Sequence, residues 1–205
     1  SEDSLIIRGA TADHATTSAG KLMIQTAQVG VTDGDILGRI DFNAPVESSG
    51  TDAILVGASI YAEADNTFAA DNNQTELVFA TGASEAATEQ MRIASDGKIG
   101  INTATPTSLL DVRGTVQVGV DGTGHDVKFF GDTAGSYMLW DEDEDALHLT
   151  DSSPIKIGDG DDMHIYHDGT NSYIKNAVGA LKIATEDSGV AVSIGHTTSE
   201  TTIND

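Results

Sequence analysis

The chain has 205 residues, no cysteine, 5% aromatic residues and a formal net charge of −23 at pH 7. This charge disfavours binding to nucleic acid and to anionic membrane surfaces, and the lack of cysteine excludes disulfides, thiolate metal sites and a cysteine nucleophile. Because no run of about 18 apolar residues occurs, we also expect no insertion into a membrane.

Residues 1–90 are predicted to form an N-terminal module of β-hairpins or a sandwich-like module, because short runs of alternating apolar and polar residues are separated by turn-forming residues. The alternation is clearest over residues 36–43, which follow the turn signal Gly34-Asp35. The polar stretch over residues 65–75 is expected to protrude as a loop. Further strands are expected at residues 21–26, 53–62 and 76–81, and the best candidate for a short helix is residues 83–91.

A connecting motif is expected over residues 91–114. Asp96-Gly97 lies between two short strands of alternating character, which is a strong signal for a β-hairpin. After Pro106, the Leu109-Leu110 pair is expected on a short turn of helix.

Residues 115–205 are predicted to be degenerate β-repeats of about 37 residues, which stack one unit on the next. An apolar–polar–apolar triplet followed by glycine occurs three times, at spacings of 39 and 37 residues. A second phrase recurs between the triplets, because Phe129-Phe130 and Tyr137 match Ile165-Tyr166 and Tyr173. The triplets supply the residues expected in the interior, Val116, Val118, Ile155, Ile157, Val192 and Ile194, and the glycines expected at close backbone approaches, Gly119, Gly158 and Gly195.

Three phrases resemble the shaft repeats of bacteriophage tail fibres, particularly those of cyanophages and other marine phages. They are Met91-Arg92-Ile93 with Asp96-Gly97-Lys98-Ile99-Gly100-Ile101 and Leu110-Asp111-Val112, the run over residues 158–174, and the run over residues 195–205. The resemblance implies an all-β fold, an elongated and intertwined parallel homotrimer of short strands. It also implies a structural role in host attachment, in the virion and outside the cell. The implied partners are two further copies of the chain, other tail or fibre proteins, and a glycan of the host cell surface.

The apolar content agrees with this assembly. Only 39% of the residues are hydrophobic and few of those are large, so a lone chain buries too little apolar area to offset its ordering entropy. Three copies wound together bury the same stripes against one another and remove free sheet edges. Because the sequence starts at Ser1 and stops just after a strand-like phrase, we interpret it as a segment of a longer chain.

Two acidic turns are candidate calcium sites, because hard cations prefer carboxylate oxygens. The acidic run from Asp141 to Asp145 takes the place of a turn in the next repeat, which favours a solvated turn. Residues 158–162 match a glycine–aspartate calcium repeat only in part, since Ile157 and His164 stand where that repeat has glycine and an apolar residue. We therefore expect no metal and no cofactor.

His164 and His167 are the other candidate metal ligands. Trimeric phage fibres can place His-x-His pairs around an axial iron, but here two residues separate the histidines. In a strand this spacing puts the two rings on opposite faces, so we expect no axial metal.

No catalytic motif stands out. The sequence has no Gly-x-Ser-x-Gly elbow, phosphate loop or dinucleotide fingerprint, and its acidic residues are too numerous for any carboxylate pair to indicate glycoside cleavage. Phe68, in the polar loop, and Trp140, beside the acidic turn, are the aromatic residues placed to stack on a glycan. We therefore expect a structural fibre segment and not an enzyme. Two alternatives stay open: a tailspike that depolymerises polysaccharide, and a non-viral extracellular β-repeat filament or adhesin.

Overall fold

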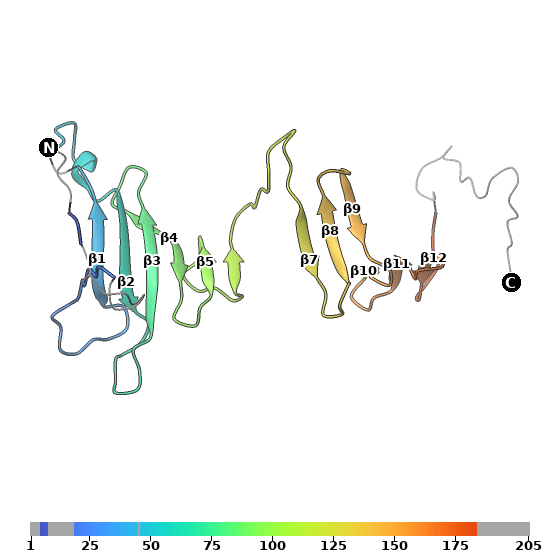
Figure 1. The fold of residues 1–205 in the computed structure, drawn as a ribbon, viewed down its shortest axis with the longest axis horizontal. Coiled ribbons are helices and arrows are strands. Elements are labelled where there is room, and N and C mark those ends of the chain that lie inside the picture. The colour runs from blue at the N-terminus through green and yellow to red at the C-terminus, as the bar shows by residue number, and fades with distance from the viewer. Residues whose placement is uncertain (1–4, 8–18, 45, 184–205) are drawn as a thin grey trace, which may run out of the picture. The chain divides into compact units, whose positions relative to one another are not determined.

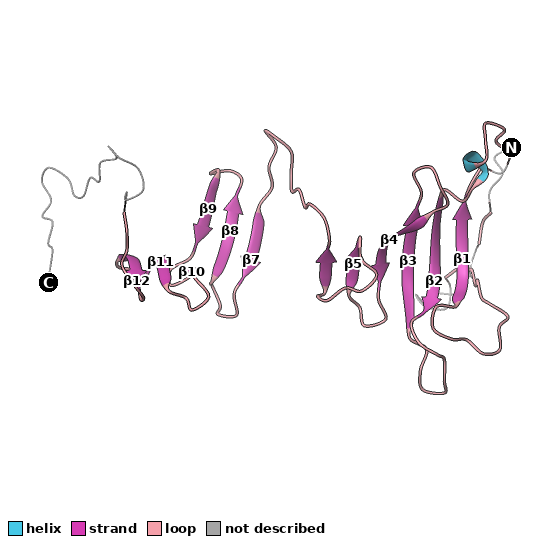
Figure 2. Cartoon of the chain, turned by 180° about the vertical axis from the view of Figure 1, so that it is seen from behind, coloured by secondary structure: helices cyan, strands magenta, loops and turns pink. Residues whose placement is uncertain are grey.

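The structure is a computed structural model that describes residues 5–7, 19–44 and 46–183. The chain divides into two compact units, Ser1–Val116 and Gln117–Asp205, which are described separately below. Over the described residues the fold is nearly all β, as predicted, with twelve strands and one short 3₁₀ helix, Asp52–Ile54 (Figures 1 and 2). Within the same residues, no helix is long and apolar enough to cross a membrane.

The first unit contains one six-stranded sheet whose strands follow one another in chain order (Figure 1). Neighbouring strands are antiparallel except β5 and β6, which are parallel. The predicted connecting motif over residues 91–114 supplies the end of β4 and the strands β5 and β6 to this sheet. The strands are β1 (Ile36–Phe42), β2 (Ala58–Ala64), β3 (Thr75–Thr81), β4 (Thr88–Ile93), β5 (Ile99–Ile101) and β6 (Leu110–Val112).

Two turns lie where the sequence predicts them. Gly34 and Gly97 have φ values of +83° and +84°, which glycine adopts without steric cost. The first turn precedes β1, and the second joins β4 to β5 in an antiparallel hairpin. The predicted strands over residues 36–43 and 76–81 are confirmed as β1 and β3. The loop between β2 and β3 extends past the ends of both strands in Figure 1.

The strand predicted over residues 21–26 is wrong, because no strand forms there. Ile24 lies against Gly38 of β1, where an added Cβ would come within 2.8 Å of the Ile24 carbonyl oxygen. The lack of a side chain at Gly38 lets this segment rest on the strand instead of pairing along its edge. The strand predicted over residues 53–62 starts late, at Ala58, because Asp52–Ile54 forms the 3₁₀ helix.

Both predicted helical segments are also wrong. Thr88–Ile93 is β4, and its pairing with β3 overrides the modest helix propensity of residues 83–91. The turn of helix predicted at Leu109-Leu110 is replaced by the start of β6, which sets Leu110 opposite Ile99 of β5.

The second unit contains two three-stranded antiparallel sheets. The strands of the first are β7 (Val127–Phe130), β8 (Tyr137–Asp141) and β9 (Ala146–Leu149). The strands of the second are β10 (Ile155–Ile157), β11 (Met163–His167) and β12 (Ser172–Asn176).

The sequence repeat corresponds to a repeated hairpin with the same register. In the β7–β8 hairpin Phe130 pairs with Tyr137, and 36 residues further on Tyr166 pairs with Tyr173 in the β11–β12 hairpin. Both pairs bring two aromatic rings together next to the turn. The centroids of Phe130 and Tyr137 are 6.3 Å apart in an edge-on arrangement, and those of Tyr166 and Tyr173 are 4.8 Å apart and stacked.

Of the three glycine-ending triplets, only the middle one is a described strand, β10. Residues 116–118 form no strand, and the third triplet, with Val192, Ile194 and Gly195, lies outside the described residues. Gly119 and Gly158 have φ values of +78° and +95°. These glycines therefore serve turns that need a left-handed backbone, in addition to the close approach that was predicted for them.

Candidate functional site: the apolar faces of the sheets

Each sheet has one face that is almost wholly apolar. Residues directly opposite each other on paired strands point to the same side of a sheet, so the register assigns every residue to a face. In the six-stranded sheet, the face that contains Ile60 and Phe79 carries no charged side chain between β1 and β6. Its large apolar residues are Ile40, Phe42, Ile60, Leu77, Phe79, Met91, Ile93, Ile99, Ile101, Leu110 and Val112.

The opposite face of this sheet is polar and yet better covered. Its buried residues are Ser59, Glu76, Val78, Ala80 and Arg92. On the apolar face, by contrast, Phe42 is 54% exposed and Leu110 is 59% exposed. In this unit two charged side chains, Glu76 and Arg92, are therefore buried on one face, while large apolar side chains such as Phe42 and Leu110 are exposed on the other.

Arg92 organises the polar face. Its guanidinium donates to the carboxylate of Glu76 on β3 and, through both Nε and a terminal nitrogen, to the carboxylate of Glu89, with an Nε–Oε1 distance of 2.6 Å. Burial raises the pKa of Glu76 although Arg92 opposes this. The hydrogen bonds to Glu89, more than those to Glu76, raise the pKa of Arg92 above its usual range. The network satisfies one cation with two anions inside the sheet.

The two sheets of the second unit repeat the apolar face. In the β7–β9 sheet it consists of Val127, Phe129, Met138, Trp140, Leu147 and Leu149. In the β10–β12 sheet it consists of Ile155, Ile157, Met163, Ile165 and Ile174, with Asn176 at one end and the His167–Ser172 pair beside the turn. Trp140 is 44% exposed and Ile174 is 61% exposed.

The other faces of these two sheets carry the cations and the aromatic pairs. Lys128, Leu139 and His148 are aligned across the first sheet, and Lys156, His164 and Lys175 across the second. The ammonium of Lys128 lies 4.5 Å from the centre of the Tyr137 ring, close enough for a cation–π contact. Leu139 is buried on this face.

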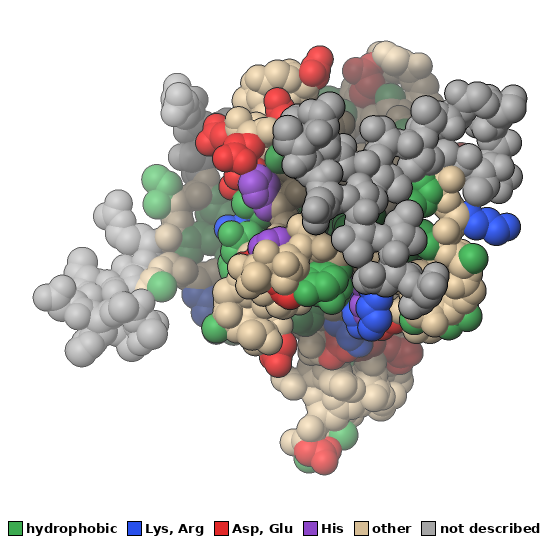
Figure 3. Space-filling model, turned by 90° about the vertical axis from the view of Figure 1, so that its right-hand side faces the viewer, with side chains coloured by type: hydrophobic (Ala, Val, Ile, Leu, Met, Phe, Trp, Pro, Cys, Tyr) green, Lys and Arg blue, Asp and Glu red, His purple; other side chains and the backbone are tan. Residues whose placement is uncertain are grey.

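The apolar interior formed by the described part of the chain is consequently very small. Among the described residues only four apolar side chains are buried, and they belong to Ala64, Val78, Ala80 and Leu139. Figure 3 shows apolar side chains open at the surface close to acidic ones. The triplet residues that were expected in the interior, Val116, Val118, Ile155 and Ile157, are between 42% and 68% exposed within one chain.

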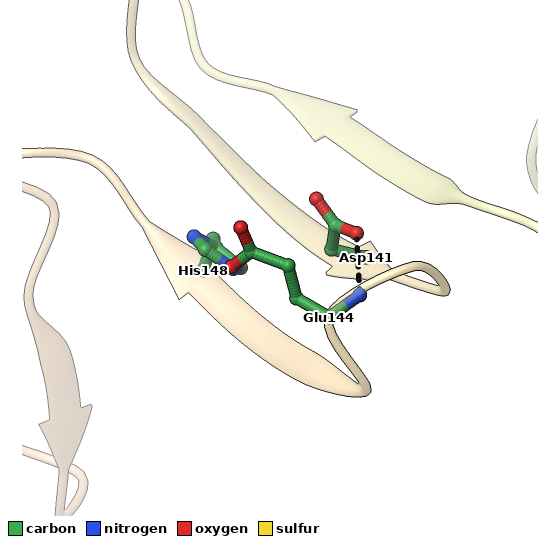
Figure 4. A group of neighbouring side chains, drawn as sticks. All are labelled: Asp141, Glu144 and His148. Atoms are coloured by element: carbon green, nitrogen blue, oxygen red, sulfur yellow. Dashed lines mark hydrogen bonds and ion pairs between the residues drawn. The ribbon is translucent and has the colours of Figure 1, made fainter.

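The acidic turn joins β8 to β9 and brings three candidate metal ligands together (Figure 4). Ligand atoms of Asp141, Glu144 and His148 lie within 4.8 Å of one another. The Asp141 carboxylate accepts the backbone N–H groups of Asp143 and Glu144, each at 3.1 Å, and Nε2 of His148 lies 2.9 Å from the Glu144 carboxylate. The three side chains thus already form contacts within the turn itself. The prediction of a solvated turn from the sequence did not include His148.

The other candidate metal ligands lie on opposite faces of a strand or already contact another side chain. His164 and His167 lie on β11 at positions of opposite parity, opposite Lys175 and Ser172 respectively. Nδ1 of His167 lies 2.9 Å from Asp151, at the turn that precedes β10. In the glycine–aspartate turn, Nζ of Lys156 donates to Asp161 at 2.6 Å, and this hydrogen bond lowers the pKa of Asp161.

The two aromatic residues proposed for glycan stacking have different surroundings. Phe68 is half-buried, and its backbone N–H donates to the carbonyl of Val31 at 3.0 Å. Trp140 lies on the apolar face of its sheet between Val127 and Leu147. Trp140 therefore belongs to an extended apolar surface and not to an isolated sugar platform.

No known family model matches this sequence, and no curated protein is significantly similar to it.

Proposed function

We propose that this chain is a structural shaft segment of an elongated homotrimeric fibre of the bacteriophage tail-fibre type, which supports host attachment and is not an enzyme. Its place is the virion, outside the cell. Its partners are two further copies of the chain, other tail or fibre proteins and, at the tip that the shaft carries, a host cell-surface glycan. The single observation that carries the proposal is that each of the three described sheets leaves large side chains of its apolar face exposed, such as Phe42, Trp140 and Ile174.

The repeated hairpin supports the role of a shaft. Phe130–Tyr137 and Tyr166–Tyr173 occupy equivalent places in two hairpins that are 36 residues apart, so the chain repeats a unit of one kind. Each unit buries little apolar area alone, and a repeat architecture becomes stable only when neighbouring units or copies cover its face.

The strand lengths point in the same direction. The strands of the second unit have three to five residues, and three-stranded sheets of this size need a covered apolar face to be stable in water. A shaft made of copies wound together supplies this cover along its whole length, and its function is to give reach and stiffness to the part that binds the host.

The mass of the purified protein in solution tests this proposal. Multi-angle light scattering coupled to size exclusion is expected to give three times the chain mass of 21.3 kDa. Negative-stain electron microscopy of the same fraction is expected to show thin rods. A monomeric mass with compact particles would overturn the proposal. New reducing ends on incubation with capsular or algal polysaccharide would support the depolymerase instead.

A further inference from the structure

We infer that the apolar face of each sheet packs against the same apolar face in other copies of this chain, so that each sheet forms a wall of an interior shared between copies, and that Trp140 lies inside the interior formed by its own sheet. The inference rests on the homotrimer proposed above. It adds which side of each sheet faces the other copies. In the second unit it assigns the face of the β7–β9 sheet with Lys128, and the face of the β10–β12 sheet with His164 and Lys175, to the solvent.

The chemistry of the open faces limits what can cover them. Between β1 and β6, and again in the β7–β9 sheet, the apolar face carries no charged residue. A partner that placed charges there would leave them desolvated and unpaired, which is costly. The partner surface must therefore also be apolar, and another copy of the chain presents such a surface.

The area of the open faces is that of a stable interface. In the second unit, Phe129, Met138, Trp140, Leu147, Ile155, Ile157, Ile165 and Ile174 are each between 39% and 61% exposed. If a fully exposed residue of this size offers about 200 Å², these eight together offer on the order of 800 Å² per copy, which is the area per partner of a standard protein interface.

The net charge favours contact through these faces alone. Each copy carries −23, so copies repel one another wherever acidic surfaces approach. The apolar faces are where two copies can meet without bringing carboxylates together. A sheet also has to bury its apolar face against another layer to be stable. Further copies of the same chain satisfy this requirement.

Trp140 provides a direct test because it is the sole tryptophan of the chain. Acrylamide is the suitable quencher, since it is neutral and is not repelled by the acidic surface. On the unaltered protein at a concentration where the trimer mass is measured, we expect a blue-shifted emission maximum and a quenching constant several-fold lower than in the urea-unfolded chain.

A pair of neighbouring variants tests the face independently. Ile174 lies on the apolar face of β12 and Lys175 lies on the opposite face. Ile174→Glu is expected to shift the light-scattering mass from trimer to monomer, because it places a carboxylate in the interior. Lys175→Glu is the matched control and is expected to remain trimeric, although it changes the net charge by twice as much.

The outcomes separate this inference from the fibre proposal. A trimeric mass with Trp140 quenched as readily as in the unfolded chain would overturn the face assignment but would not contradict the proposed fibre. A trimer that survives Ile174→Glu but dissociates in Lys175→Glu would do the same. A monomeric unaltered protein would overturn both. If Ile174→Glu fails to fold, the quenching of the unaltered protein still decides the assignment.

Discussion

Among the described residues, Arg92 is the cation that forms ion pairs with two carboxylates. It is buried together with Glu76, and it is shared between two carboxylates on neighbouring strands. A buried ion pair adds little to stability compared with an apolar replacement, but loss of one partner leaves an uncompensated charge inside the protein. The stability of the six-stranded sheet should therefore be far more sensitive to Arg92 than to any exposed cation.

Arg92→Met is expected to lower the free energy of unfolding by about 3–5 kcal/mol, because Glu76 and Glu89 lose their counter-charge inside the sheet. Urea unfolding at fixed protein concentration measures the change. Arg39→Met is the control, since Arg39 pairs with Asp41 at the surface, and an exposed pair contributes about 1 kcal/mol or less. Equal losses in the two variants would contradict the network described here.

Glu63 gives a pH-dependent prediction. Burial raises the pKa of the Glu63 carboxyl above its usual value of 4.5, and Arg92 opposes the shift. A carboxyl whose pKa is higher in the folded state stabilises the fold when protonated, and this contribution is lost as the pH rises through the folded pKa. Glu63→Gln is therefore expected to be more stable than the unaltered protein at pH 7.

The difference in stability between Glu63→Gln and the unaltered protein should shrink as the pH falls through the folded pKa of Glu63. It should disappear below about pH 4.5, where Glu63 is protonated in both the folded and the unfolded chain. Thermal melts across this pH range follow the difference. A difference that stays constant down to acid pH would show that the amide acts by another route. Glu85→Gln, at an exposed carboxyl, removes the same charge and controls for general effects of charge.

At the scale of the elements, the turns decide whether the short sheets form. Gly158 ends β10 with a φ of +95°, and a Cβ there would come within 2.7 Å of the Asp162 carboxylate. Gly158→Ala is expected to cost about 1–2 kcal/mol, mainly because a left-handed backbone is unfavourable for an L-residue. Gly114→Ala is the control, because Gly114 has an ordinary φ and open space around its Cα.

Differential scanning calorimetry of the two glycine variants measures the effect. Gly158→Ala should lower the Tm, while Gly114→Ala should leave it unchanged or raise it slightly, since alanine restricts the unfolded chain. The reverse order would mean that the turn after β10 does not limit the stability of its sheet.

The acidic turn between β8 and β9 is expected to hold without metal. Asp141 already accepts two backbone N–H groups, and Glu144 faces His148. Treatment with EDTA should therefore leave the Tm of the purified protein unchanged, and added Ca²⁺ should not raise it beyond the general effect of salt, for which added Na⁺ at equal ionic strength is the control. A Tm that falls with EDTA and recovers with Ca²⁺ or Zn²⁺ would make Asp141, Glu144 and His148 a metal site.

The sequence predicts elements best where local chemistry decides them. The Asp96-Gly97 hairpin and the alternation over residues 36–43 specify their structure within a few residues, and both are confirmed. Residues 83–91 have mild helix propensity, but residues 88–91 belong to β4, whose structure is determined by pairing with β3. Local propensity cannot report such a contact.

The candidate site was only partly predictable for a related reason. Alternation in a strand indicates that one face is apolar, but it does not indicate which face the chain itself covers. The register was needed to show that Arg92 and Glu76 lie on the enclosed side while Leu110 lies on the open one. The contact between Glu144 and His148 depends on how the acidic turn folds back on β9, which spacing alone does not determine.

For the whole molecule, the charge of −23 sets the response to salt. Copies that meet through uncharged faces gain nothing from ion pairs across the interface, whereas the acidic surfaces around that interface repel. Salt screens this repulsion, with a Debye length of about 10 Å at 0.1 M. The proposed trimer should therefore be weaker in dilute buffer than in concentrated salt.

Sedimentation velocity over a range of protein concentrations tests this response. Raising NaCl from low to high concentration is expected to move the monomer–trimer transition to lower protein concentration. Sucrose at matched viscosity is the control for solution effects on sedimentation. Dissociation on addition of NaCl would indicate that the copies are held by ion pairs and would contradict contact through the apolar faces.

The shared register of the β7–β8 and β11–β12 hairpins also bears on how such a chain changes length over generations. Duplication or loss of one whole 36-residue unit leaves the apolar side and the solvent-facing side of every strand unchanged. Insertion of a single residue within a strand exchanges the two sides. Natural relatives of this protein should accordingly differ in length by whole units, with smaller insertions confined to the turns.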